Sequence, residues 1–226
     1  GGMQVIASGP LLRNCVFRNN SADTSAGGLY CESSNDLQLI DCQFIGNSAD
    51  YHGAGMYCAP NSTAQISNCV FRANTGGFGA GLLINQADLS LVECTFEENV
   101  SLASGGAIAI EGAGTAVTNC TFVSNSAYNG GAVFNVLGAN STWENCEFSQ
   151  NTAKYNGGGM LNMSSAPTLT NCRFLGNSSS TVGGGMIDSC DNDCCESGAT
   201  LNGCSFIGNT SVEHGGGVLL DQGIHI

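Results

Sequence analysis

Apolar residues recur along this chain in three short groups that repeat about every 26 residues, with polar residues and glycines between them. The most regular group is Cys-x-Phe-x-x-Asn, which occurs eight times. In a strand, residues two apart face the same side, so each Cys and its Phe are predicted to face inward together. The eight copies have Phe17, Phe44, Phe71, Phe96, Phe122, Phe148, Phe174 and Phe206, followed by Asn20, Asn47, Asn74, Asn99, Asn125, Asn151, Asn177 and Asn209.

Two further apolar columns follow the same period. One comes after a triplet of small residues such as Gly105-Gly106-Ala107, and the other lies three residues before each cysteine. The first reads Leu29, Met56, Leu82, Ile108, Val133, Met160, Met186 and Val218, and the second reads Leu12, Leu39, Ile66, Leu91, Val117, Trp143, Leu169 and Leu201. No helical period of 3.6 residues accompanies them.

Three strands this short bury no face alone, but they are stabilised when the same strand of the next repeat stacks on them at about 4.8 Å. The sequence therefore predicts an all-β fold, a right-handed parallel β-helix of about eight rungs with three short strands each. Neither a six-residue period nor an L-x-x-L-x-L pattern of leucine-rich repeats is present. Residues 1–226 are expected to form a single segment of a longer array, with one insertion at about residues 188–199.

Turn residues support this coil. The position before each repeat cysteine is mostly Asn or Asp, which tolerate a left-handed bend, as at Asn14 and Asp41. The Asn after each Phe is predicted to form an internal ladder of stacked amides. The glycine triplets are expected to supply positive φ or close packing at the remaining corner.

A further apolar column lies beside the Leu29 column, at Tyr30, Tyr57, Leu83, Ala109, Phe134, Leu161, Ile187 and Leu219. Because adjacent residues of a strand face opposite sides, this column is expected to form an exposed stripe for other copies or other protein chains. A covering loop from outside this segment, or simple β-propensity, is the alternative explanation of the column. The rung edges at Gly1–Met3 and Gly217–Leu219 are expected to be open to stacking.

The paired motifs, Phe17 with Asn20 through Phe206 with Asn209 and Gly27-Gly28 through Gly216-Gly217, resemble the FxxN and GG[A/L/V/I] repeats of the chlamydial polymorphic outer-membrane protein family. The resemblance covers essentially the whole chain. It implies a secreted β-helix with an adhesive or surface-coat role and with host or cell-surface receptors as partners. This chain departs from the family pattern in having a cysteine before every Phe.

Charge and cysteine content limit the possible ligands and the cellular location. The net charge of −13 opposes binding to nucleic acid, which needs a basic surface. The sequence contains no run of 18 apolar residues, so no direct membrane span is predicted. Thirteen cysteines without a C-x-x-C pair favour an oxidising compartment, so an extracellular or cell-surface location is expected.

The cysteines leave alternatives open. The eight repeat cysteines are expected to pack as buried thiols, although rung spacing also permits bridges between neighbours. Cys31 and Cys58 occupy equivalent positions in adjacent rungs and are candidates for a disulfide. In the insertion, Cys190 is expected to pair with Cys194 or Cys195, and zinc binding by these three cysteines is less favoured.

The insertion also offers oxygen ligands for Ca²⁺ at Asp191, Asp193 and Glu196. A disulfide-tied loop is the favoured interpretation, because the spacing of a calcium-binding loop is incomplete. No resident cofactor or metal is therefore expected, with Ca²⁺ as the one ion that this loop could hold.

Glycosylation sequons occur at several asparagines. Those within the inward ladder, such as Asn99, are expected to stay bare. The candidate acceptors are Asn61 and Asn140, followed by Asn19 and Asn162.

No catalytic residue is assigned. Glu93, Glu97 and Glu98 cluster, as do Glu144 and Glu147, but neither group has an activating partner in the repeat frame. The expected function is a non-catalytic extracellular structural or adhesive β-helix, part of a surface coat, adhesin or fibre. The alternative is a carbohydrate-active enzyme or glycan-binding module on the same scaffold.

Overall fold

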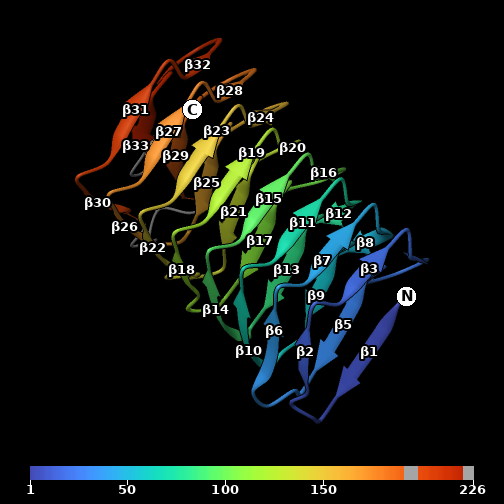
Figure 1. Ribbon diagram of the computed structural model, residues 1–226. Helices are drawn as coiled ribbons and strands as arrows, with labels where there is room; N and C mark the ends of the chain where they lie inside the picture. The colour runs from blue at the N-terminus through green and yellow to red at the C-terminus, as the bar shows by residue number, and fades with distance from the viewer. Residues whose placement is uncertain (191–197, 221–226) are drawn as a thin grey trace.

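Parallel strands of two to five residues make up the regular structure in the computed structural model, which describes residues 1–190 and 198–220. Each repeat forms one rung of a coil, and equivalent strands of successive rungs pair in parallel. The coil advances steadily from the N-terminal to the C-terminal rungs (Figure 1). Four sheets result, and no strand in the described ranges pairs within its own rung.

Sheet A has nine strands and carries the Leu29 column: β1 (Met3–Ile6), β5 (Leu29–Glu32), β9 (Met56–Cys58), β13 (Leu82–Asn85), β17 (Ile108–Glu111), β21 (Val133–Val136), β25 (Met160–Met163), β29 (Met186–Ser189) and β33 (Val218–Leu220). Sheet B has eight strands and carries the Leu12 column: β2 (Leu11–Arg13), β6 (Leu37–Ile40), β10 (Thr63–Ser67), β14 (Asp88–Val92), β18 (Ala116–Thr118), β22 (Thr142–Glu144), β26 (Thr168–Thr170) and β30 (Thr200–Asn202).

Sheet C carries the phenylalanine column: β3 (Val16–Arg18), β7 (Gln43–Ile45), β11 (Val70–Arg72), β15 (Thr95–Glu97), β19 (Thr121–Val123), β23 (Glu147–Ser149), β27 (Arg173–Leu175) and β31 (Ser205–Ile207). Sheet D was not predicted: β4 (Ser21–Ala22), β8 (Ser48–His52), β12 (Thr75–Phe78), β16 (Val100–Ser101), β20 (Ser126–Ala127), β24 (Thr152–Ala153), β28 (Ser178–Ser179) and β32 (Thr210–Ser211). Each rung thus has three main strands, as predicted, and a fourth short one.

The phenylalanines stack directly over one another through all eight rungs. Successive ring centroids lie 4.5 to 5.1 Å apart, and the ring planes are within 11° of parallel. The repeat cysteines face the same interior, as Cys94 and Phe96 show with no exposed surface. The predicted alignment of equivalent side chains is confirmed.

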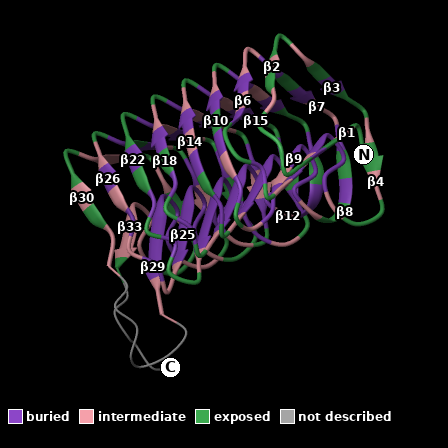
Figure 2. Ribbon diagram, turned by 90° about the horizontal axis from the view of Figure 1, so that it is seen from below, coloured by how far each residue is buried: buried purple, intermediate pink, exposed green. Residues whose placement is uncertain are grey.

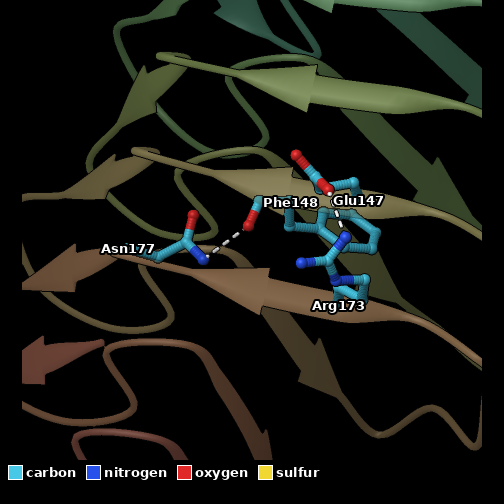
Figure 3. Close-up of polar contacts among 4 residues, drawn as sticks. All are labelled: Glu147, Phe148, Arg173 and Asn177. Carbon is cyan, nitrogen blue, oxygen red and sulfur yellow. Dashed lines mark hydrogen bonds and ion pairs between the residues drawn. The ribbon is translucent and has the colours of Figure 1, made fainter. Parts of the chain in front are cut away.

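The asparagine ladder is also confirmed. Asn125 donates from Nδ2 to the carbonyl of Phe96 in the preceding rung (2.9 Å) and to Oδ1 of Asn151 in the next rung (3.0 Å). The backbone N–H of Asn125 donates to the same Oδ1 (2.9 Å). Figure 3 shows the equivalent bond from Asn177 to the carbonyl of Phe148. The ladder satisfies polar groups that would otherwise be buried without partners.

Left-handed residues form the corners. The position before each repeat cysteine has positive φ in every rung, including Asn14 (φ 55°) and Asp41 (φ 56°), as predicted. The position two after each Phe is also left-handed, as at Ala73 (φ 53°) and Glu98 (φ 56°). Four of the eight residues in this column are Gly or Asn, which favour that conformation, and the sequence prediction did not include this corner. Gly105, at the glycine corner, has φ 70°.

The expected exposed stripe is wrong for most of its length. Leu83, Ala109, Phe134, Leu161 and Ile187 are at most 7% exposed. Two side chains that precede glycine corners, Phe78 and Val182, pack against this column on the outer face of sheet A. The chain's own loops therefore provide the cover. Figure 2 shows these strands of sheet A as buried along most of their length.

Candidate functional site

The outer face of sheet A is hollowed near β1, β5 and β9, where the outward column carries Gln4, Tyr30 and Tyr57 instead of aliphatic residues. The hollow measures about 570 Å³. Its floor is formed by these strands, and its wall by the loop residues before the glycine corner. The lining residues are Gly1, Gly2, Met3, Gln4, Thr24, Ser25, Ala26, Tyr30, His52 and Tyr57.

Strand alternation places the two tyrosines on this face. Leu29 and Cys31 face the core with no exposed surface, so Tyr30 between them faces outward, and Tyr57 pairs with it in the next rung. The two ring centroids are 5.4 Å apart, with the planes at 65°. The His52 ring lies 5.9 Å from the Tyr57 ring and 6.2 Å from the Phe78 ring. Three partly exposed rings thus line or border one hollow.

Polar groups tie the rings in place. Asn85 donates from Nδ2 to Oη of Tyr57 (3.3 Å). Burial raises the pKa of Tyr30, and the charge of Glu32 and its hydrogen bond to Tyr30 raise it further, so the phenol stays protonated. His52 has a buried Nδ1 atom with no hydrogen-bond partner within the protein. The hollow therefore combines ring faces with hydroxyl, amide and imidazole groups.

Two carboxylates border this face but do not form a pair. Burial raises the pKa of Glu111, and the nearby charge of His52 acts in the opposite direction. Glu32 and Glu111 occupy the same outward column three rungs apart, which places them roughly 14 Å apart at the usual strand spacing. That separation exceeds the roughly 5 to 10 Å between the two carboxyl groups of glycoside hydrolases.

The acidic clusters seen in the sequence lie elsewhere. Glu93 and Glu98 are exposed residues at left-handed corners on the two sides of sheet C. A carboxylate oxygen of Glu147 forms an ion pair with a guanidinium nitrogen of Arg173 in the next rung (3.3 Å), as Figure 3 shows. These positions agree with solvated faces, as the sequence indicated.

A second polar column, which sequence reasoning missed, crosses the core of the C-terminal half. Asn135, Asn162 and Asp188 occupy the inward column of sheet A that Cys31, Cys58 and Ile84 fill in earlier rungs. Asn135 donates to Asn162 (2.7 Å), and Asn162 donates to Oδ1 of Asp188 (2.5 Å). The substitution of amides into an apolar column was the available signal.

Both ends of this column are bonded. Trp143 donates from Nε1 to Oγ of Ser141 (2.7 Å), and Ser141 donates to Oδ1 of Asn135 (3.3 Å). At the other end, the backbone N–H of Ala199 donates to Oδ2 of Asp188 (2.7 Å), which ties together the two sides of the insertion. Burial raises the pKa of Asp188, while these hydrogen bonds oppose the rise.

The predicted Ca²⁺ ligands Asp191, Asp193 and Glu196 lie outside the described residues, as do Cys194 and Cys195. Cys190 is disulfide-bonded. Among residues 1–190 and 198–220, no three His, Cys, Asp or Glu side chains are grouped so that they could hold a metal ion.

The repeat cysteines are thiols in this structure, in keeping with the packing interpretation. Each donates to backbone carbonyls, as Cys69 does to Ser67 (3.2 Å), and burial raises the pKa of Cys42 to about 11. Cys31 and Cys58 are also unbridged, but their Sγ atoms lie only 2.8 Å apart. The Cys31–Cys58 bridge stays a prediction.

Three of the four glycosylation candidates are exposed: Asn19, Asn61 and Asn140. The fourth, Asn162, is wrong as an acceptor, because its side chain is fully buried and bonded within the polar column. Asn162 lies two residues after Met160, which faces inward, so strand alternation already predicts a buried side chain at Asn162.

Comparison with known proteins identifies the fold. A family model described as a right-handed β-helix region matches residues 1–122 and 80–226, which together span the whole chain. This match agrees with the right-handed parallel coil expected from the repeats. No curated protein and no solved structure matches the chain. Within the described residues, no helix is long and apolar enough to cross a membrane.

Proposed function

Because this chain belongs to the right-handed β-helix family, we propose that it is a non-catalytic structural or adhesive segment of a secreted or surface-displayed protein. The observation that carries the proposal is that the residues repeated in every rung have structural positions inside the coil. Phe, Asn and Cys, the residues present in every rung, stack inside the coil or bond to one another there. They build a rigid rod with long outer faces, which suits presentation of a binding surface.

Polymorphic outer-membrane protein repeats offer a more specific assignment within this proposal, based on the paired FxxN and GG motifs. Extracellular or cell-surface location is supported by the disulfide at Cys190 and by the exposed sequons at Asn19, Asn61 and Asn140. Partners on this view are other chains, glycans or cell-surface receptors. The acidic surface, with a net charge of −13, keeps such a rod soluble.

A carbohydrate-active enzyme on the same scaffold is the weaker candidate. Glu32 and Glu111, which share an outward column of sheet A, are three rungs apart, too far for a shared glycosidic bond. Binding of a glycan without cleavage needs no such pair.

Location and adhesion can be tested separately on cells that make the protein. Antibodies against the folded chain should label intact, unpermeabilised cells or detect the protein in the medium. Beads coated with the native chain should then adhere to cells or extracellular matrix more strongly than beads coated with the denatured chain. Labelling only after permeabilisation, or equal adhesion of the two kinds of bead, would overturn the proposal.

A further inference from the structure

We propose that Tyr128 and Tyr155 form a modification site, at which an external oxidant joins the two rings into dityrosine. This inference rests on the extracellular or cell-surface location proposed above, where peroxide and peroxidases can reach the chain. The two tyrosines follow β20 and β24, between sheet D and the glycine corner, and these strands lie side by side (Figure 1).

The exposed tyrosines gather along this edge of the coil. Tyr51, Tyr128 and Tyr155 are 62%, 39% and 46% exposed, and each lies at the end of a strand of sheet D or just after it. Tyr30 and Tyr57 on sheet A are less exposed. A soluble oxidant can therefore reach the phenols at the sheet D edge directly.

Tyr128 and Tyr155 come from neighbouring rungs and already form a pair. The backbone N–H of Tyr155 donates to the carbonyl of Tyr128 (2.8 Å). The ring centroids lie 5.7 Å apart, with the planes at 40°. This separation is in the range of aromatic rings in contact. Two radicals formed on these rings would meet without any unfolding of the coil.

Lys154 contacts both rings. Its Nζ atom donates to Oη of Tyr128 (3.3 Å) and lies 4.5 Å from the centroid of that ring. The same atom lies 5.9 Å from the centroid of the Tyr155 ring. A cation close to an aromatic ring is attracted to its face. The ammonium group of Lys154, the one lysine of the sequence, therefore favours the arrangement in which the two rings lie together.

Side chains that would compete for the oxidant are shielded in the core. Trp143 is buried, and so are the repeat cysteines from Cys42 to Cys172. Oxidation of a cysteine requires an accessible thiolate, which burial prevents. An oxidant in solution therefore meets the phenols of Tyr128 and Tyr155 before it meets these side chains.

The reaction balances with hydrogen peroxide as the oxidant, acting through a peroxidase. Each phenol loses one electron and one proton to become a phenoxyl radical, and the peroxide takes up both electrons and both protons to become water. The radicals couple through a bond between the two ring carbons ortho to the phenol oxygens. The hydrogens at those carbons move to the oxygens as protons, which restores both phenols. The product has lost two hydrogen atoms and joins two rungs covalently.

The test treats the pure full chain, at high dilution, with peroxidase and hydrogen peroxide. We expect the blue fluorescence of dityrosine in the monomer, and we expect peptic peptides containing Tyr128 and Tyr155 to be linked with the loss of two hydrogens. Tyr128→Phe and Tyr155→Phe should each abolish this linked pair of peptides. Unfolding the wild-type chain in urea before the treatment should also remove the preference for this pair, because the rings then no longer meet.

The matched control is Tyr51→Phe, which removes the most exposed tyrosine and leaves the pair intact. A second control, Tyr57→Phe, removes a less exposed ring that lies 5.4 Å from Tyr30. Both controls should give the wild-type yield of the link between Tyr128 and Tyr155. Loss of the fluorescence in either control, or links formed only between molecules, would overturn the site.

Native material separates this inference from the proposed location. Protein taken from the surface or the medium of the producing cells should contain the link without added peroxide. If the protein is found there with the two peptides unlinked, the location stands and the modification fails. If the protein stays inside the cell, the location fails, and the reaction of the pure chain still decides whether the two rings couple.

Discussion

Each ladder asparagine from Asn47 to Asn209 bonds through both polar atoms of its side chain. Oδ1 of Asn125 accepts from the backbone N–H and from Nδ2 of Asn99 (3.0 and 2.9 Å), while its own Nδ2 donates to Phe96 and Asn151. No other side chain of that size offers the same two donors and two acceptors at this position. This explains why the residue is Asn in all eight repeats.

Asn125→Leu should therefore lower the free energy of unfolding by about 3 kcal/mol or more, because it leaves several buried polar groups unpaired. Urea unfolding followed by circular dichroism measures the change. Thr142→Ala, at an exposed outward position, is the control and should change the stability little. Similar midpoints for the two variants would show that the ladder does not stabilise the coil.

Asp188 is the one carboxylate within the buried polar column. Its pKa is raised by burial, so the folded chain holds the proton more tightly than the unfolded chain does. The contribution of Asp188 to stability is then greatest at low pH, and it falls as the pH rises from about 4 through the raised pKa.

Asp188→Asn removes this titration. The stability of the variant relative to wild type should rise between about pH 4 and neutrality, whatever constant offset its lost hydrogen bond adds. Urea unfolding of both proteins across this range gives the difference directly. Parallel pH curves would mean that Asp188 ionises as freely in the coil as in the unfolded chain.

At the scale of elements, the glycine corner is set by close approach of neighbouring rungs. Gly131 has no left-handed backbone, yet a Cβ added there would lie 2.2 Å from the carbonyl oxygen of Gly158. Gly114, by contrast, has no atom within 4 Å of the equivalent point. Close packing therefore requires a glycine at position 131, whereas position 114 has room for a side chain.

Gly131→Ala should destabilise the chain by roughly 2 kcal/mol or more, because rungs at this corner must move apart. Gly114→Ala should be neutral or slightly stabilising, since it restricts only the unfolded chain. Thermal unfolding of both variants is the measurement. Equal losses would contradict the packing of rungs seen at this corner.

Cys31 and Cys58 pair in register on β5 and β9, with Sγ atoms 2.8 Å apart. Rung spacing lies within the Cα separation that a disulfide allows. After alkylation and peptic digestion without reduction, we expect peptides containing these two cysteines to remain linked. Peptides with Cys94 or Cys120 should carry alkylated thiols. Alkylation of Cys31 and Cys58 would refute the bridge.

Elements were predictable where residue type and position coincide. The Cys-x-Phe strands, the amide ladder and the Asn or Asp corner each follow from one physical requirement. The second left-handed corner carries a weaker signal, because Gly46 and Gly176 favour positive φ whereas Ala73, Glu98 and Ser124 at the same position do not. Sheet D was missed because its strands are short and their inward residues, such as Ala127 and Ala153, are small.

At the scale of the whole molecule, the coil is a series of rungs in which each contacts its neighbours, so its stability is close to a sum over rungs and interfaces. The repeat period was sufficient to predict this architecture. The hollow was not predictable, because it depends on how far each loop folds back over sheet A. The same loops bury the column that alternation alone assigns to the surface.

The central claim is that equivalent side chains of successive rungs lie directly over one another. The most direct test is nuclear Overhauser contact between rings in protein labelled only at phenylalanine. Rings such as Phe44, Phe71 and Phe96, with centroids 4.6 Å apart, should give contacts that link each repeat to the next. An absence of contacts between phenylalanines of neighbouring repeats would contradict the account.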